Sequence, residues 1–291
     1  MKCNLCPRRC GADRSRETGV CGENETMRAA LAGLHFWEEP CLAGTGGAGA
    51  VFFTGCNLRC VYCQNAEISR GRTGKPVSPD RLREIFAGLI DQGADCIDLV
   101  TPTHFLPQIA AALAAERLPV PVVWNSGGYE SVEALKRLEG LIDVYLPDYK
   151  YADPALAGRL SAAPDYPETA LAAIREMHRQ TGRPAFGEDG MLLRGVLVRH
   201  LVLPGFIENT FDCIDALTGA FAPGEILISL MSQYTPPASP LPIESLNRRL
   251  REDEYRRCVD YLYLCGVEDG FVQELDSADA DFVPDFDCSG L

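Results

Sequence analysis

Hydrophobic residues along this 291-residue chain form short, β-branched runs that alternate with longer amphipathic stretches. The short runs predict buried strands, and apolar residues at helical spacing predict helices between them. The expected strands are 50–54, 96–101, 120–125, 142–147, 195–203 and 225–231. The expected helices are 79–92, 106–116, 131–139, 168–180, 208–218 and 243–264. Strands that alternate with helices in this way indicate an α/β fold with a parallel sheet.

Six strand–helix repeats predict a partial (β/α)6 TIM-like barrel with a Cys-rich N-terminal extension. We expect the extension to cover residues 1–49, and the barrel, which ends in an acidic segment, to cover residues 50–291. The glycine-rich stretch 44–49, "GTGGAG", is the expected flexible hinge before the first strand. Parallel strands carry functional groups at their carboxyl ends, so the site is expected in the loops that follow the strands.

The charge and cysteine content narrow the classes of protein that fit. A net charge of −14 disfavours nucleic acid as a partner, because binding phosphate groups requires a basic surface. No apolar run approaches the about 18 residues of a membrane span, and the chain does not begin like a signal peptide. We therefore expect a cytoplasmic protein with no membrane partner. In that reducing compartment, 13 cysteines indicate metal binding rather than disulfides.

Three cysteines follow the first expected strand in "FFTGCNLRCVYCQN", at Cys56, Cys60 and Cys63. A structural zinc takes four protein ligands, so a zinc site here would need a distant fourth ligand. A 4Fe-4S cluster held by three thiolates keeps one iron open. The spacing, with Tyr62 before the last cysteine, resembles the cluster motif of the radical S-adenosylmethionine (SAM) superfamily. The resemblance implies an enzyme whose cluster binds SAM and cleaves it reductively to a 5′-deoxyadenosyl radical.

The chain is similar to homologues of the pyruvate formate-lyase activating enzyme in "FFTGCNLRCVYCQN" and in "HLVLPGFIENT". This resemblance implies that polar groups after the third and fourth strands lie near the methionine part of SAM, and near a monovalent cation in some members. The matching residues here are Asn125, Ser126, Asp148 and Lys150. The alternatives are that the first two only shape a turn and that the last two form a surface ion pair.

The sequence departs from the superfamily after the second strand, where a Gly-Gly-Glu motif commonly binds the SAM amino group. Here Thr101 and Thr103 supply hydroxyls without a carboxylate. His104 is a candidate proton donor or substrate contact, or else a packed histidine. Arg199 and Gln233 are candidates to face the barrel mouth, where Arg199 contacts SAM or substrate, or else forms a salt bridge that lines the barrel.

A second set of thiols lies in "CNLCPRRCGADRSRETGVCG", at Cys3, Cys6, Cys10 and Cys21. Four cysteines in a segment with few apolar residues indicate that a metal supplies its folding energy. Zinc in a four-sulfur shell is the simplest interpretation, an auxiliary 4Fe-4S cluster is the second, and no metal is the third.

The expected function is that of an oxidoreductase that acts on a protein or peptide, as activating enzymes do. The alternatives are a radical SAM enzyme with a small-molecule substrate, and a non-catalytic iron-sulfur redox carrier or sensor. The resemblance implies flavodoxin or ferredoxin as electron donor. Such donors are acidic, so we expect either that they dock on the net-positive N-terminal segment or that its arginines form a structural cap; the arginines are Arg8, Arg9, Arg14, Arg16 and Arg28.

Overall fold

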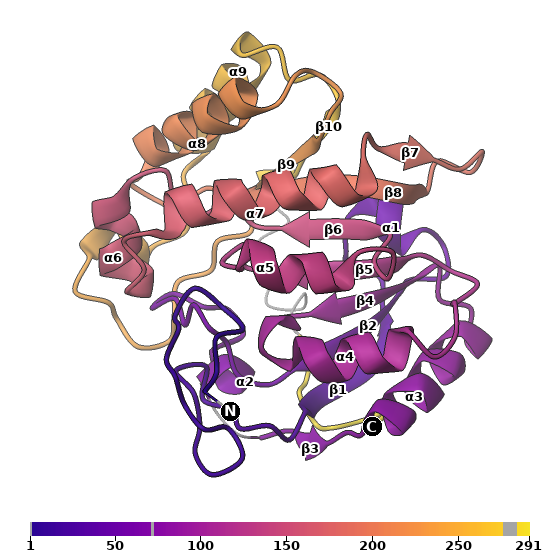
Figure 1. Cartoon of the computed structure of the whole chain (residues 1–291). Coiled ribbons are helices and arrows are strands. Elements are labelled where there is room, and N and C mark those ends of the chain that lie inside the picture. Colours follow the sequence, from indigo (N-terminus) through magenta and orange to yellow (C-terminus); the bar gives the residue numbers. More distant parts are fainter. Residues whose placement is uncertain (1, 71–72, 276–283) are drawn as a thin grey trace.

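Six parallel strands form the centre of the computed structural model, which describes residues 2–70, 73–275 and 284–291 (Figure 1). In spatial order they are β9 (Leu227–Met231), β8 (Leu192–Leu201), β6 (Val144–Pro147), β5 (Val122–Ser126), β4 (Cys96–Val100) and β2 (Ala48–Phe53). The six strands expected from the hydrophobic pattern are confirmed, with ends that shift by a few residues. The fold is α/β, with the sheet of a partial TIM-like barrel.

Short or antiparallel strands extend this sheet, and the sequence pattern did not predict them. β10 (Gly270–Val272) continues it in parallel beyond β9, while β7 (Ala185–Phe186) pairs with β8 in antiparallel fashion. At the other edge β1 (Arg28–His35) runs antiparallel to β2, and β3 (Lys75–Pro76) pairs with β1. β1 thus joins the central sheet from within residues 1–49, and the division into two parts at residue 49 stays a prediction.

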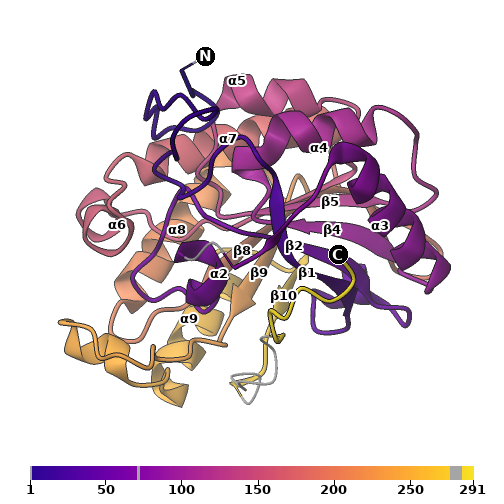
Figure 2. The same ribbon diagram turned by 90° about the horizontal axis from the view of Figure 1, so that it is seen from below.

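Helices cover the convex face of the sheet (Figures 1 and 2). They are α3 (Pro79–Asp91), α4 (Leu106–Leu113), α5 (Val132–Leu135) with η2 (Lys136–Leu138), α6 (Pro154–Ser161), α7 (Tyr166–Thr181) and α8 (Ile207–Ala220). The Ser78 hydroxyl caps α3 by accepting a hydrogen bond from the Arg81 N–H, as Ser before Pro at a helix start indicates. Apolar side chains such as Phe86 and Trp124 fill the space between the sheet and these helices.

The expected helix 243–264 is wrong, because the structure divides it into η3 (Glu244–Asn247) and α9 (Glu252–Leu264). Arg248 lies between them with an extended backbone. Its guanidinium bonds the Glu254 carboxylate, which also accepts the Arg251 N–H and so caps the start of α9. These local bonds satisfy the backbone at the break, and they compete with a continuous helix. No helix among the described residues is long and apolar enough to cross a membrane.

The concave face of the sheet has its own apolar core at the amino ends of the strands. Alternate residues, including Val123, Val144 and Leu197, contribute to it, and the short helix α1 (Pro40–Ala43) adds Leu42. Side chains of a strand alternate between the two faces, so Trp124 and Val196 belong to the outer core instead. The carboxyl ends of the strands are left to form the cavity described below.

The stretch "GTGGAG" is not a free hinge but a close-packed turn between α1 and β2. A Cβ on Gly46 would lie 2.0 Å from the Gly93 carbonyl oxygen. The Gly46 N–H donates to the Asp95 carboxylate at 2.8 Å. Glycine stands here because only a residue without a side chain allows the two backbone segments to approach.

Candidate functional site

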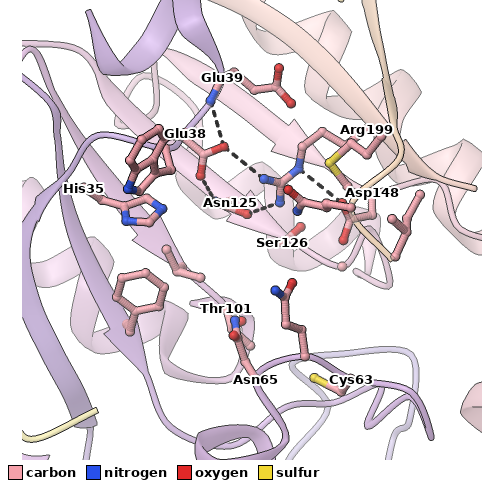
Figure 3. Close-up of a pocket in the computed structure, with 18 of the residues that line it drawn as sticks. His35, Glu38, Glu39, Cys63, Asn65, Thr101, Asn125, Ser126, Asp148 and Arg199 are labelled. Atoms are coloured by element: carbon pink, nitrogen blue, oxygen red, sulfur yellow. Dashed lines mark hydrogen bonds and ion pairs between the residues drawn. The ribbon is translucent and has the colours of Figure 1, made fainter. Parts of the chain in front are cut away.

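A cavity of about 710 Å³ opens at the carboxyl ends of the parallel strands (Figure 3). Small-molecule sites in proteins usually measure about 300–1,000 Å³, so the volume suits a ligand of this class. Most residues expected from the sequence line it: Cys56, Cys60, Tyr62, Cys63, Thr101, Asn125, Ser126, Asp148, Lys150, Arg199 and Gln233. Because they come from six different strand ends, the sheet alone brings them together.

The loop after β2 presents the three cysteines to this cavity, and each sulfur has a hydrogen-bond donor. The Leu58 N–H lies 3.4 Å from Cys56 Sγ, and the Ser161 hydroxyl lies 3.0 Å from Cys60 Sγ. The hydroxyl of Ser69, in α2 (Ala66–Arg70), lies 3.5 Å from Cys63 Sγ. Burial raises the pKa of Cys56 to about 12, a penalty that a bound metal removes.

The donor to Cys60 ends a buried chain of hydroxyl groups. Tyr62 Oη lies 2.7 Å from Tyr151 Oη, which lies 2.8 Å from Ser161 Oγ. When Cys60 is a thiolate it can only accept, so each hydroxyl donates in turn towards the sulfur. Such chains strengthen each bond through polarisation. Tyr62 therefore connects the cavity wall to Cys60, which the sequence motif alone did not reveal.

The three thiols fit an open iron-sulfur cluster better than a single metal ion. Within the described residues, no three His, Cys, Asp or Glu side chains converge on one ion position. The thiolates of a cluster bind separate irons, so they need not converge. Three soft ligands beside an open cavity match a 4Fe-4S cluster that keeps one iron for another ligand. A monovalent cation near Asn125 and Asp148 stays a prediction.

Arg199 is the centre of a polar network on the opposite wall of the cavity (Figure 3). Its guanidinium donates to Asn125 Oδ1 at 2.6 Å, to Asp148 Oδ1 at 3.2 Å and to Glu38 Oε1 at 3.1 Å. Arg199 therefore forms barrel-lining ion pairs, which is one of the two roles that the sequence led us to expect for it. Asp148 also pairs with Lys150, and both side chains are largely buried, so this is not a surface ion pair. Burial alone would raise the Asp148 pKa, but the two cations hold it below its usual value.

Thr103, in the segment after β4, is not placed as expected for a residue that binds SAM. Its hydroxyl donates to buried Glu130 at 2.9 Å, and Thr103 does not line the cavity. The Ser126 hydroxyl donates to the same carboxylate at 3.0 Å. Thr101 does line the cavity, and its φ of +60° is strained for a β-branched residue. Strain of this kind gathers at functional positions, where the surrounding structure must hold it.

His104 was expected to be either a proton donor or substrate contact, or a packed histidine. The structure shows a packed histidine that does not face the cavity. It is 2% exposed, and its Nε2 lies 2.6 Å from the Thr54 carbonyl oxygen. Burial lowers its pKa to about 4, so the ring is neutral at pH 7. Gln233 lines the cavity and accepts a hydrogen bond from the Gln273 side chain at 3.0 Å. A catalytic role for Gln233 stays a prediction.

The end of β1 and the loop between β1 and α1 supply cavity residues that the sequence reasoning missed, among them His35, Glu38 and Glu39. Burial, with the neighbouring Glu38, raises the pKa of Glu39 to about 7. The available signal was the pair of adjacent carboxylates in "HFWEEP". These carboxylates could not be placed from sequence, because β1 runs antiparallel to β2 and so brings the loop into the barrel from the amino ends of the parallel strands, opposite the cysteine loop.

The N-terminal cysteines gather in a segment beside the three-cysteine loop. Burial raises the pKa of Cys6 to about 11, and the nearby thiols of Cys21, Cys3 and Cys10 add to the rise. The Cys21 carbonyl accepts the Cys56 N–H at 3.1 Å, which joins the two cysteine segments directly. Whether these cysteines hold zinc, a second 4Fe-4S cluster or no metal stays a prediction.

Two arginines of the expected donor-docking surface fold inward instead. The Arg8 guanidinium donates to four carbonyl oxygens, including those of Asn57 at 2.7 Å and Ser161 at 2.6 Å. Arg14 is buried and donates to the carbonyl oxygens of His104 and Asn24. That prediction is therefore wrong for these two residues, which bind the N-terminal segment to the barrel.

Comparison with known proteins agrees with this geometry. The family described as the radical SAM superfamily matches residues 50–212. An uncharacterised protein of Methanocaldococcus jannaschii is 30% identical over 274 residues, covering 89% of this chain and 73% of that protein. Streptococcus suis SuiB bound to S-adenosylmethionine is similar in fold, with a TM-score of 0.53 and 14% identity. SuiB bound to its precursor peptide SuiA gives 0.52 and 14%. Each of the two SuiB comparisons covers 77% of this chain. This chain spans about half of SuiB (49% and 48%).

Proposed function

Because this chain belongs to the radical SAM superfamily, we propose that it cleaves SAM reductively to a 5′-deoxyadenosyl radical that abstracts hydrogen from a protein or peptide. Members of the superfamily are enzymes, and the family implies a 4Fe-4S cluster and SAM. The finer proposal is a type of activity similar to that of the activating enzymes of glycyl-radical enzymes. The observation that carries the proposal of SAM cleavage is the loop of Cys56, Cys60 and Cys63 at the edge of the cavity.

The residues of the chain have separable tasks in this proposal. When bound, the cluster supplies the electron that breaks the sulfonium carbon–sulfur bond of SAM. Cys56, Cys60 and Cys63 would hold it, and their hydrogen-bond donors stabilise negative charge on the sulfurs. Lys150 and Arg199 offer positive charge to a carboxylate such as that of SAM.

A protein or peptide substrate is supported by two observations. SuiB, which is similar in fold, is known bound to its precursor peptide. The sheet here has six central parallel strands rather than the eight of a closed TIM barrel, which leaves a wider mouth. Flavodoxin or ferredoxin is the proposed electron donor, and the cytoplasm the proposed location.

The test is SAM cleavage by anaerobically reconstituted protein reduced with dithionite, with 5′-deoxyadenosine measured by chromatography. We expect cleavage by the wild type, and at least about a 100-fold loss in Cys56→Ala, Cys60→Ala and Cys63→Ala. Cys265→Ala is the matched control, since Cys265 lies in the C-terminal turn of α9, away from the cavity. Full cleavage by any of the three variants would contradict the proposal. Iron binding without SAM binding in the wild type would favour a redox carrier or sensor.

A further inference from the structure

The cavity wall opposite the cysteines carries more negative charge than its basic residues balance. Glu38 and Asp148 share the ion pairs of Arg199. In the part of the chain that the structure describes, neither Glu39 nor Asp98 forms an ion pair with a basic side chain. Burying an ionised carboxylate without a cation costs several kcal/mol or more, so the group is expected to bind a proton or a positively charged partner.

Glu38 and Glu39 both line the cavity, with Asp98 behind Glu38, so a positively charged partner would reach them from the cavity. Glu39 lines the cavity and is 8% exposed, so its carboxylate is largely removed from bulk water. Asp98 is 1% exposed, and its Oδ1 receives no hydrogen bond. Its Oδ2 shares the Asn125 Nδ2 with Glu38, so the Asp98 carboxylate lies against the same wall. Burial, with the charge of Glu38, raises the pKa of both Glu39 and Asp98.

The loop that carries Glu38 and Glu39 also presents exposed apolar side chains. Phe36 and Trp37 line the cavity with exposed fractions of 54% and 63%. Exposed aromatic side chains beside a pocket are typical of peptide-binding surfaces. The face of a tryptophan ring also attracts cations. The loop thus combines exposed aromatic contact area with a buried carboxylate, that of Glu39, which forms no ion pair among the described residues.

An organic cation suits this arrangement better than a metal ion. The described carboxylates do not converge on a single-ion position, as a bound metal would require. A guanidinium or ammonium group donates hydrogen bonds in several directions, so it can bridge acceptors that lie apart.

We propose that residues 36–39 form a substrate-binding loop in which Glu38 and Glu39 bind a guanidinium or ammonium group of a peptide side chain. The inference rests on the proposed function, because it names the class of peptide that enters the cavity. The basic side chain would reach the acidic wall while the adjoining backbone passes Phe36 and Trp37. It would then lie across the cavity from Cys63 (Figure 3).

The test measures binding of three blocked tripeptides to the anaerobic, cluster-loaded, SAM-bound protein by isothermal titration calorimetry. The peptides are acetyl-Gly-Arg-Gly-amide, acetyl-Gly-Lys-Gly-amide and the uncharged acetyl-Gly-norleucine-Gly-amide. We expect the wild type to bind at least one basic peptide about tenfold more tightly than the norleucine peptide. The preferred basic peptide identifies whether guanidinium or ammonium is the group recognised.

Glu39→Gln should reduce this preference at least about fivefold and leave affinity for the norleucine peptide unchanged. Glu139→Gln is the matched control, because Glu139 is an exposed carboxylate that pairs with Arg179, and it should keep the preference. Equal wild-type affinities for the three peptides, or a preference that survives Glu39→Gln, would overturn the inference. SAM cleavage by the same wild-type preparation distinguishes the failures: no cleavage rejects the proposed function, and cleavage with equal affinities rejects only the substrate class.

Discussion

The two cysteine segments touch each other, yet they are held in place by different means. The three-cysteine loop follows a buried central strand, so the hydrophobic core of the sheet fixes where Cys56, Cys60 and Cys63 lie. The N-terminal segment before β1 has little regular secondary structure, with one isolated bridge between Lys2 and Asp13. Side-chain bonds from arginines to carbonyl oxygens attach it to the barrel instead.

This difference separates the two kinds of task that thiols perform. A loop positioned by the core keeps its geometry without metal, and can leave one coordination position open for chemistry. A segment with little apolar content depends on added bonds for its fold, which is typical of a structural metal site. Because the Cys21 carbonyl accepts the Cys56 N–H, a structural change in one segment will shift the position of the other.

The largest expected effect comes from removing one cysteine set at a time. Cys56→Ala/Cys60→Ala/Cys63→Ala should lose all SAM cleavage and about four irons per chain, and should keep one zinc at the N-terminal set. The measurement is elemental analysis of the purified variant beside the wild type. Iron in place of zinc in that variant would show that the N-terminal cysteines hold a second cluster, and no metal would show that they hold none.

Two neighbouring arginines provide the next comparison. Arg8→Gln removes the donor to four carbonyl oxygens, so we expect the free energy of unfolding to fall by about 3 kcal/mol. Arg9→Gln should change it by less than about 0.5 kcal/mol, since Arg9 is exposed. Urea unfolding of the metal-loaded proteins measures both. Equal values for the two variants would mean that Arg8 does not hold the segment to the barrel.

The hydroxyl donor to Cys60 gives a smaller effect, which is visible in the cluster itself. Ser161→Ala removes a hydrogen bond that stabilises negative charge on the sulfur, so the reduced cluster becomes less stable. We expect the one-electron equilibrium to shift about three- to tenfold towards the oxidised form, where tenfold is about 59 mV. A redox titration followed by electron paramagnetic resonance measures it.

Ser69→Ala is the internal control for this shift. Its hydroxyl lies 3.5 Å from Cys63 Sγ, against 3.0 Å for the Ser161–Cys60 pair, and a longer bond is weaker. A potential that moves equally in both variants would point to a general disturbance rather than to the hydroxyl chain.

The smallest expected effect concerns the electron donor. The exposed Arg9 and Arg16 remain candidates for a docking surface after Arg8 and Arg14 are excluded. Arg9→Gln/Arg16→Gln should slow flavodoxin-driven SAM cleavage about threefold and leave dithionite-driven cleavage unchanged. Arg137→Gln/Arg175→Gln removes the same charge from exposed positions outside the segment and should change neither rate. A similar slowing in both double variants would indicate a response to net charge rather than docking.

The sequence predicted those parts of the molecule that depend on local pattern. The six parallel strands follow from buried β-branched runs, and a strand end places the three cysteines at the mouth of the barrel. The same reasoning also brought Asn125, Asp148 and Lys150 to one cavity, because parallel strands end at one edge.

The missed parts depend on contacts between distant segments. β1 reads "RAALAGLH", whose alanines and glycine give a weak strand signal, so the carboxylates after it could not be placed. Asp98 lies inside an apolar strand, and nothing in the sequence shows that the loop after β1 brings Glu38 to the same Asn125 amide. Sequence cannot tell Arg8 from Arg9 either, since carbonyl acceptors some 50 and 150 residues away decide which one folds inward.

The close-packed turn "GTGGAG" has a consequence for anyone who wishes to engineer this chain. Its composition resembles that of the linkers used to join fused domains, and it would be a natural place to insert a reporter or to open new termini. Gly44 and Gly46 are instead among the positions least able to accept a side chain, because a Cβ there would lie 2.3 Å from the Asp95 carboxylate and 2.0 Å from the Gly93 carbonyl oxygen. In a saturation-mutagenesis library we expect this low-complexity stretch to tolerate substitutions as poorly as the core.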